Sequence, residues 1–167
     1  MPPQTFRSIP WEEFHRDARA LCQDLTHTRT ASRILAIARG GLIPAGIIAR
    51  ELDLREIQVV CVKSYVTGTG STQANQRGAV QILSPLPEGD GSGWLVVDDL
   101  ADTGATIQAI RTHLPNAAYA AVYTKPEGKG SLDHFVVEVP QTSWIHFPWD
   151  LEPMYAQPIS EKPINTP

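Results

Sequence analysis

The sequence predicts an α/β fold with a mostly parallel central sheet flanked by helices. Short, continuous apolar runs, which are typical of strands buried on both faces, alternate along the chain with segments of helical periodicity. Such alternation indicates βαβ units, and these assemble into parallel sheets. The chain has 167 residues, of which 42% are hydrophobic and 19% are charged, so it can bury one sizeable core. We therefore expect residues 1–167 to form a single domain.

Two helices and two strands are expected in the first part of the chain. Pro10–Leu25 predicts a helix because its apolar side chains recur in steps of three and four residues. Ile34–Ala38 is a continuous apolar run and predicts a buried strand. A second helix follows this strand and runs to about Leu52. Ile57–Val62 is apolar and β-branched, and it predicts the next strand.

The second part of the chain continues this alternation. Three more apolar runs predict strands at Trp94–Val97, Tyr119–Tyr123 and Phe135–Val139. A helix is expected at Thr103–His113, between the first two of these strands. Residues 85–93 predict a turn-rich connector.

Residues 64–79 differ from the rest of the chain. They contain almost no large apolar side chain and are rich in Gly, Thr, Ser and Gln, so they predict a loop. Long loops in compact domains are often active-site lids. The alternative is a tolerated surface insertion.

Composition excludes several classes of protein. The formal net charge of −4 argues against a general nucleic-acid binder, which usually carries a basic excess. The apolar runs are far shorter than the roughly 20 residues of a spanning helix, so we expect no integral membrane segment. The N-terminus lacks the pattern of a secretory signal, and Cys22 and Cys61 are expected to be reduced core thiols, as in a cytoplasmic protein. The five histidines lack the spacing of a metal site.

The stretch Val96–Thr106 carries the clearest functional signal. Asp98 and Asp99 stand at the end of a predicted strand, where open α/β sheets bind ligands. A turn of Asp, Thr and Gly then opens a helix, and backbone N–H groups at such a position bind phosphate. Carboxylates for sugar hydroxyls or Mg²⁺ beside a phosphate-binding turn suit a phosphorylated ribose. The alternative is two solvated aspartates followed by a helix with an Asp or Thr cap.

The same stretch resembles the phosphoribosyl-pyrophosphate (PRPP) binding signature of type I phosphoribosyltransferases. Ala36–Pro44 is similar to the pyrophosphate loop of the bacterial xanthine–guanine enzymes of that family. Tyr123–Pro126 resembles their purine-contacting lysine segment, and Pro140–Asp150 resembles their purine-binding hood. The resemblance covers roughly residues 9–160. It implies the type I phosphoribosyltransferase fold, with a lid at about 64–79 and a small C-terminal hood at about 140–160.

The resemblance implies a purine salvage enzyme. Such an enzyme moves the 5-phosphoribosyl group from PRPP to N9 of guanine, xanthine or hypoxanthine and releases pyrophosphate. It implies Mg²⁺ as cofactor and a homodimer or homotetramer as the assembly. Positioning and charge stabilisation should dominate catalysis, because the protein has little covalent work to do.

On the ribose side, the resemblance assigns roles to carboxylates and to the turn that follows them. Asp98 and Asp99 would bind the ribose hydroxyls and Mg²⁺, and Asp150 would lie near the metal. Asp102 would act as general base at purine N7, with a helix cap as the alternative reading. The 5′-phosphate pocket would be formed by Asp102, Thr103, Gly104, Ala105 and Thr106.

Two arginines are implied on the pyrophosphate side. Arg39, with Gly40 beside it, would hold pyrophosphate oxygens through forked hydrogen bonds. The peptide bond Ala38–Arg39 is a candidate for the cis form. Arg77 resembles the lid arginine that closes on pyrophosphate.

On the purine side, Lys125 would donate to the O6 and N7 edge, which disfavours adenine. Trp144 would stack on the ring, and the carbonyl of Ile145 would accept from the 2-amino group of guanine. Two alternatives remain: a PRPP-fold regulator that binds nucleic acid, and a phosphoribosyltransferase for another base. The acidic charge and the presence of Asp102, Lys125 and Trp144 count against the regulator.

Overall fold

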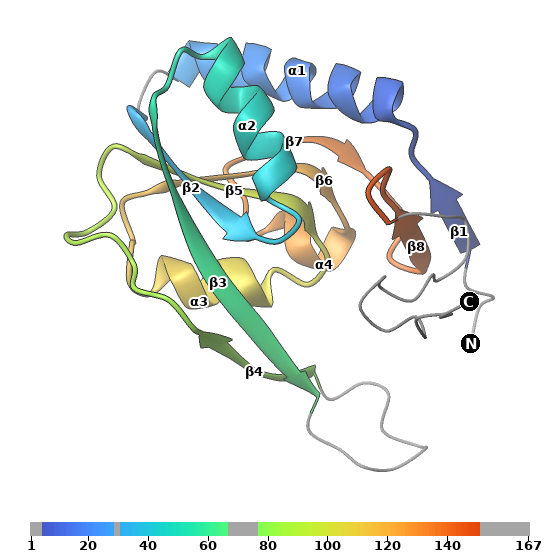
Figure 1. Ribbon diagram of the computed structural model, residues 1–167. Coiled ribbons are helices and arrows are strands. Elements are labelled where there is room, and N and C mark those ends of the chain that lie inside the picture. The colour runs from blue at the N-terminus through green and yellow to red at the C-terminus, as the bar shows by residue number, and fades with distance from the viewer. Residues whose placement is uncertain (1–4, 29–30, 67–76, 151–167) are drawn as a thin grey trace, which may run out of the picture. The chain divides into compact units, whose positions relative to one another are not determined.

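Figure 1 shows the computed structural model of the protein, which describes residues 5–28, 31–66 and 77–150. The chain forms two compact units. The larger unit is Asp17–Gln141. The smaller unit combines the chain up to Arg16 with the chain from Thr142 onward.

The larger unit is built on a six-stranded sheet of order β4-β3-β2-β5-β6-β7. Its strands are β2 (Arg33–Ala38), β3 (Glu56–Val66), β4 (Arg77–Ile82), β5 (Trp94–Ala101), β6 (Ala118–Thr124) and β7 (His134–Glu138). Neighbouring strands are parallel except at the edge, where β4 pairs with β3 in the antiparallel sense. The predicted α/β fold with a mostly parallel sheet is confirmed.

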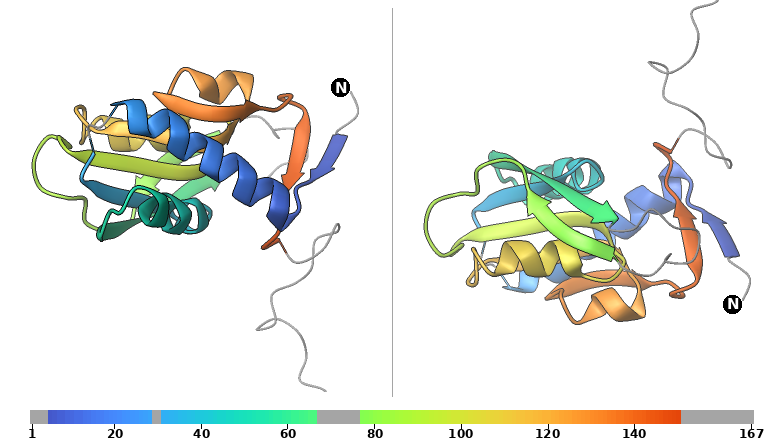
Figure 2. Two further views of the ribbon diagram at one scale, coloured as in Figure 1. Left: turned by 90° about the horizontal axis from the view of Figure 1, so that it is seen from above. Right: turned by 90° about the horizontal axis from the view of Figure 1, so that it is seen from below.

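Helices cover both faces of this sheet (Figures 1 and 2). α2 (Leu42–Glu51) packs on β2 and β5 through its buried residues, and α1 (Trp11–Thr28) lies on the same face. α3 (Ala105–Arg111) lies on the opposite face, and α4 (Pro126–Lys129) is a single turn directly after β6. Because the helices cover the faces of the sheet, the carboxyl ends of β2, β5 and β6 are left for the loops that follow these strands.

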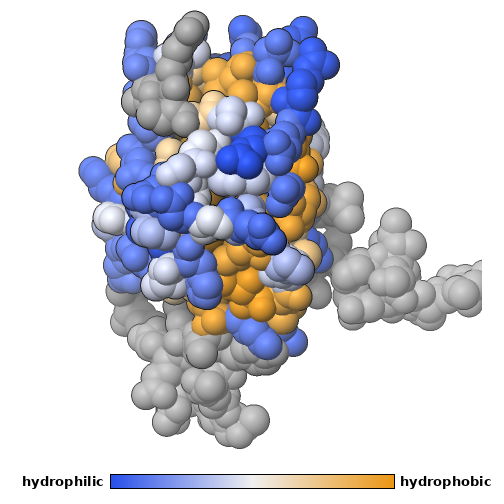
Figure 3. Space-filling model, turned by 90° about the vertical axis from the view of Figure 1, so that its left-hand side faces the viewer, coloured by the Kyte–Doolittle hydropathy of each residue, from blue (hydrophilic) through white to orange (hydrophobic). Residues whose placement is uncertain are grey.

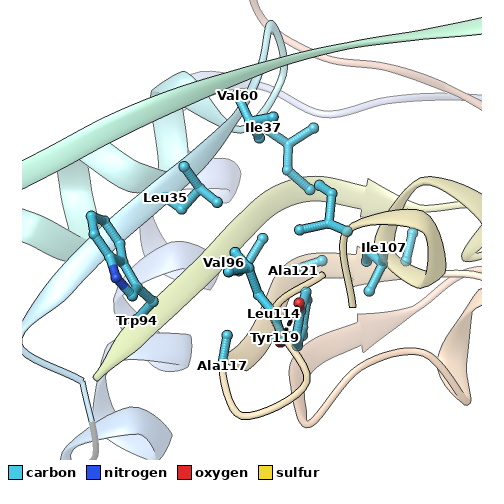
Figure 4. Packing of buried hydrophobic residues seen from close by; sticks show 12 residues of the cluster. Leu35, Ile37, Val60, Trp94, Val96, Ile107, Leu114, Ala117, Tyr119 and Ala121 are labelled. Carbon is cyan, nitrogen blue, oxygen red and sulfur yellow. Dashed lines mark hydrogen bonds between the residues drawn. The ribbon is translucent and has the colours of Figure 1, made fainter. Parts of the chain in front are cut away.

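The main core lies between the sheet and α3 (Figure 4). Leu35 and Val96, from neighbouring central strands, belong to the same buried cluster as Ile107 of the helix, and all three are at most 2% exposed. Tyr119 is fully buried in the same cluster, and its hydroxyl donates to the carbonyl of Leu114 at 2.9 Å. This packing holds β2 beside β5, so that the loops after these strands meet.

Two element boundaries differ from the sequence prediction at the centre of the sheet. β5 continues past Val97 to Ala101 because Asp98, Leu100 and Ala101 pair with β6. The helix after it begins at Ala105 rather than Thr103, since Gly104 at its N-cap has the left-handed φ of 77°.

The predicted loop at 64–79 is shorter than expected. β3 extends to Val66, and β4 begins at Arg77, which pairs with Val66 across the edge of the sheet. Residues 64–66 and 77–79 are therefore strand. The middle of the predicted lid, 67–76, lies outside the described residues.

The smaller unit contains two short strands that were not predicted. β1 (Thr5–Ser8) pairs in parallel with β8 (Ser143–His146). Beside them, the rings of Phe147 and Trp149 stack at 4.7 Å, and Phe14 packs edge-on against Trp149 at 4.8 Å. This aromatic cluster is the core of the segment predicted as a hood, of which residues 151–160 lie outside the described part.

Both cysteines are free, but only one is a core thiol. Cys22 is 5% exposed on the buried side of α1, where burial and then the Glu51 carboxylate raise the pKa of its thiol to about 11. The prediction of a core thiol is wrong for Cys61, which is exposed because it alternates with buried Val60 along β3.

This difference predicts unequal thiol reactivity. At pH 8, an aromatic disulfide reagent is expected to modify Cys61 rapidly and Cys22 only after unfolding in guanidinium, since the thiolate is the reacting form. Spectrophotometric counting of released thiolate measures both phases. A Cys61→Ser variant should lose the fast phase only. Rapid modification of both thiols in the native protein would contradict the burial of Cys22.

Within residues 5–28, 31–66 and 77–150, no helix has both the length and the apolar character needed to cross a bilayer.

Candidate active site

Three loops meet at one edge of the larger unit's sheet. They follow β2, β5 and β6, which are adjacent and parallel, so their carboxyl ends lie together. The first loop carries Arg39 and Gly40, the second carries Asp102–Gly104, and the third begins at Lys125. The sheet therefore brings together residues that lie far apart in the sequence.

The loop after β2 packs tightly against β5. A Cβ on Gly40 would overlap the carboxylate of Asp99, and a Cβ on Gly41 would overlap the backbone carbonyls of Val97 and Ile37. The peptide bond before Arg39 is cis, as the resemblance implied, and the arginine side chain is exposed. Glycines are required here because the backbone of this loop approaches the acidic end of β5 so closely.

The end of β5 holds the two adjacent carboxylates. Asp98 Oδ1 accepts from the N–H of Asp99 at 3.0 Å, and Asp99 Oδ1 accepts from the N–H of Leu100 at 2.7 Å. Burial, followed by the charge of Asp99, raises the pKa of Asp98 well above its usual range. Two like charges in a confined space favour the binding of a cation.

The donor set fits Mg²⁺. Hard carboxylate oxygens suit this ion, which usually takes one or two carboxylates and fills its other positions with water and substrate oxygens. In the described part of the chain, no three His, Cys, Asp or Glu side chains gather to hold a metal by themselves. In the smaller unit, Asp150 Oδ2 accepts from the N–H of Phe147 at 2.9 Å, so this oxygen serves a turn, and a metal role for Asp150 stays a prediction.

The raised pKa of Asp98 predicts that asparagine at this position stabilises the metal-free protein. The folded state holds the Asp98 proton more tightly than the unfolded chain, whose pKa is about 3.9, so the free energy of unfolding falls as pH rises through the higher folded value. Asp98→Asn keeps an oxygen for the Asp99 N–H and removes the charge.

We therefore expect Asp98→Asn to raise Tm at pH 8 without divalent cations, with a gain that shrinks toward pH 4. Thermal unfolding followed by circular dichroism at both pH values measures the difference. A gain that is equal at pH 4 and pH 8, or a loss at pH 8, would count against the electrostatic interpretation.

The turn between β5 and α3 is shaped by Gly104. Its φ of 77° is in the left-handed region that favours glycine, and a Cβ there would lie 2.6 Å from Ser131 Oγ. No side chain caps the helix, so the alternative reading of Asp102 or Thr103 as a helix cap is wrong. The hydroxyls of Thr103 and Thr106 are partly buried beside this turn.

Asp102 instead pairs with Lys125. Lys125 Nζ lies 3.2 Å from Asp102 Oδ1, and the lysine side chain is only 8% exposed. The lysine is held in place because its own N–H donates to the carbonyl of Ala101 at 2.9 Å. A buried ammonium group needs a partner, and here the partner is the carboxylate predicted to act as general base.

Sequence reasoning missed one neighbour of this pair. Gln141 Nε2 donates to Asp102 Oδ1 at 3.1 Å, and Gln141 Oε1 accepts from the N–H of Glu127 at 3.0 Å. A single glutamine after a proline carries no recognisable signal, so only the structure identifies it.

The remaining predicted residues are on two other strands. Trp144 and Ile145 are on β8 of the smaller unit, where Trp144 is 54% exposed and Ile145 is 7% exposed. Trp144 therefore offers an accessible ring face. Arg77 is the first residue of β4. The roles of these three residues stay predictions.

Comparisons with known proteins agree with this geometry. The phosphoribosyl transferase domain family matches residues 10–156. A xanthine-guanine phosphoribosyltransferase from Chromohalobacter salexigens is 44% identical over 155 residues, which cover 93% of this chain and 90% of that relative. One from Nitratidesulfovibrio vulgaris (strain Hildenborough) is also 44% identical, over 93% of this chain and 91% of its own length.

Solved structures support the same fold. The purine phosphoribosyltransferase from Pyrococcus horikoshii Ot3 superposes with a TM-score of 0.73 at 26% identity, covering 91% of this chain and 99% of that one. The xanthine-guanine-hypoxanthine phosphoribosyltransferase from Helicobacter pylori has a TM-score of 0.68 at 23% identity, covering 87% of this chain and 94% of that one.

Proposed function

The chain belongs to the phosphoribosyltransferase family, and from this premise we propose that it transfers the 5-phosphoribosyl group of PRPP to N9 of a 6-oxopurine and releases pyrophosphate. Its relatives make it a purine phosphoribosyltransferase of the salvage type. The observation that carries the proposal is the ion pair of Lys125 with Asp102, at the same sheet edge as Asp98 and Asp99. A donor and an acceptor for a purine thus accompany carboxylates for a ribose.

In the proposed complex, the acidic end of β5 binds the ribose of PRPP. Asp98 and Asp99 accept hydrogen bonds from its hydroxyls. The 5′-phosphate occupies the turn formed by Asp102, Thr103, Gly104, Ala105 and Thr106. Support comes from the left-handed turn at Gly104, since turns of this kind can present successive backbone N–H groups to an anion, and from the partly buried residues Thr103 and Thr106, whose hydroxyls can donate.

The arginines take the pyrophosphate in this proposal. Arg39 and Gly40 belong to the loop that packs against Asp99, so a guanidinium there can reach oxygens bound beside the carboxylates. Arg77 would approach from the start of β4. We propose Mg²⁺ on the oxygens of Asp98 and Asp99, where the ion would neutralise charge that develops on the leaving pyrophosphate.

The purine end is proposed to use the Lys125–Asp102 pair. As the C1′–N9 bond forms and the bond from C1′ to the pyrophosphate oxygen breaks, the purine becomes more acidic. Asp102 then accepts the proton from N7, while Lys125 Nζ donates to O6. Trp144 would stack on the ring, a contact worth about 1–3 kcal/mol per base, and the Ile145 carbonyl would accept from the 2-amino group.

A homodimer or homotetramer is proposed as the assembly. Figure 3 shows apolar side chains exposed between hydrophilic ones on one face of the molecule. In the larger unit, Leu42, Ile57, Val59 and Leu83 are each 43–54% exposed. Where exposed apolar side chains form a contiguous patch, they are typical of protein interfaces. The two free cysteines suit a reducing compartment, and we propose the cytoplasm.

A steady-state panel tests the base specificity. Mg²⁺ and PRPP are offered with guanine, xanthine, hypoxanthine, adenine and uracil, and pyrophosphate release is followed. We expect turnover with 6-oxopurines and at least about 10²-fold lower kcat/KM with adenine, because its 6-amino group would face the Lys125 ammonium. Equal turnover with adenine, or turnover with uracil alone, would assign the enzyme to another base.

A further inference from the structure

Gln141 links the two loops proposed to contact the purine. It stands at the C-terminal end of the larger unit, three residues after β7 ends at Glu138. Its side chain reaches Asp102 in the loop after β5 and the N–H of Glu127 in α4, directly after Lys125 and Pro126. One side chain thus makes hydrogen bonds to both loops.

The orientation of this amide is fixed by its partners. The N–H of Glu127 can only donate, so it selects the carbonyl oxygen of Gln141, at 3.0 Å. The amide nitrogen must then face Asp102, where it lies 3.1 Å from Oδ1 and 3.4 Å from the backbone carbonyl. A carboxylate and a carbonyl can only accept, so both contacts agree with the same orientation.

Asp102 Oδ1 consequently receives donors from two elements. Lys125 Nζ lies 3.2 Å away on the β6 side, and Gln141 Nε2 lies 3.1 Å away on the β7 side. A lysine ammonium on a flexible stem fixes a distance but little direction, whereas a planar amide anchored at its other end fixes both. Gln141 therefore restricts the rotation of the Asp102 carboxyl group.

We propose that Gln141 is a positioning residue, which holds the Asp102 carboxylate in the orientation for taking the purine proton. Through its bond to the Glu127 N–H, it also fixes the position of the turn after Lys125 relative to that carboxylate. This inference rests on the proposed function, because it assumes that Asp102 receives that proton. A misplacement of about 1 Å in such a group can cost about 10²-fold in rate. Hydrogen bonds to a charged group are also stronger than neutral ones.

Two variants distinguish the hydrogen bonds of Gln141 from the space that its side chain fills. Gln141→Glu keeps the size and the acceptor for the Glu127 N–H but loses the donor to Asp102. Gln141→Met keeps the approximate size and loses both contacts. We expect each to lower the single-turnover rate of GMP formation by about 10- to 100-fold at pH 8, with the KM for PRPP unchanged within about threefold.

The pH dependence of the variant rates is a second readout, and it would not change if Gln141 only filled space. Two carboxylates at hydrogen-bond distance share a proton, so the introduced carboxyl of Gln141→Glu regains a donor as pH falls. The charged groups beside it are the Asp102 carboxylate and the Lys125 ammonium, whereas Glu127 contacts Gln141 through its backbone N–H. From pH 8.5 to pH 5.5, the ratio of wild-type to Gln141→Glu rates should shrink at least about fivefold, while the ratio for Gln141→Met stays constant.

Gln23→Glu is the matched control, since it adds the same charge at an exposed position of α1. It should follow the wild type at every pH. If the Gln141→Glu ratio is as flat with pH as that of the control, or if both Gln141 variants turn over like the wild type, the inference is wrong.

Hydrogen exchange makes the test independent of turnover. The Glu127 amide should be protected in the wild type and in Gln141→Glu, and unprotected in Gln141→Met, because only methionine removes its acceptor. An unprotected Glu127 amide in the wild type overturns the inference whatever the activity. Absence of turnover in the wild type with intact protection would instead overturn the proposed function.

Discussion

Replacing Asp102 by asparagine is expected to lower the single-turnover rate of GMP formation by about 10²–10⁴-fold, the usual contribution of a general base. Asparagine keeps an oxygen for Lys125 Nζ and for the Gln141 amide, so the surrounding contacts can persist. It cannot take up the N7 proton. The KM for PRPP should change little, since the turn that would bind the 5′-phosphate is unaltered.

Rapid-quench mixing of enzyme, Mg²⁺-PRPP and substoichiometric guanine measures this rate directly. Asp53→Asn is the matched control, because Asp53 is exposed, pairs only weakly with Arg55, and has a positive φ of 52° that asparagine tolerates. It should react like the wild type. A rate for Asp102→Asn within about threefold of the wild type would remove Asp102 from the role of base.

The second large effect is expected at Gly40. A Cβ at this position would overlap the carboxylate of Asp99, and the side chain of Asp99 must then leave its place beside the loop. Since Asp99 is proposed to bind both the ribose and Mg²⁺, Gly40→Ala should lower kcat/KM for PRPP by about 10²-fold or more. Initial rates at varied PRPP and fixed guanine measure the loss.

Gly46 supplies the control for this substitution. It lies inside α2, and a Cβ there would meet no atom within 4 Å. Gly46→Ala should leave kcat/KM unchanged and raise the free energy of unfolding by up to about 1 kcal/mol, because alanine is the better helix former. Equal activity of Gly40→Ala and Gly46→Ala would show that the contact with Asp99 does not matter for PRPP.

Much of the fold could be predicted because the central strands are apolar on both faces. The runs at Ile34 and Trp94 have no polar alternation, and only a strand covered by helices on both sides explains them. The acidic pair after the second run can also be interpreted, because open α/β sheets bind ligands at the carboxyl ends of their strands. Fold class and the place of the site follow from these features.

Other elements could not be predicted from local patterns. β1 is exposed along its whole length and has no apolar period, and its partner strand lies near the other end of the chain. The exposed apolar side chains of Ile57 and Val59 give β3 the pattern of a fully buried strand, which it is not. Whether β1 forms a strand depends on its pairing with a distant segment. How far β3 is buried depends on which other elements pack over it.

The candidate site shows the same division. The Asp102 and Lys125 segments are recognisable, but nothing in the sequence says that their side chains form an ion pair. The contacts of Gln141 cannot be predicted from the sequence, because they are made to two loops that lie 39 and 14 residues away along the chain. Sequence identifies the groups, and the sheet determines which of them meet.

The most direct test of the proposed activity is the stoichiometry of products with one substrate pair. Purified protein, Mg²⁺-PRPP and guanine should yield GMP and pyrophosphate in equal amounts, measured together by chromatography, and omission of Mg²⁺ should suppress both. Formation of no nucleotide from guanine, xanthine or hypoxanthine, under conditions where the protein is folded, would contradict its assignment as a 6-oxopurine phosphoribosyltransferase.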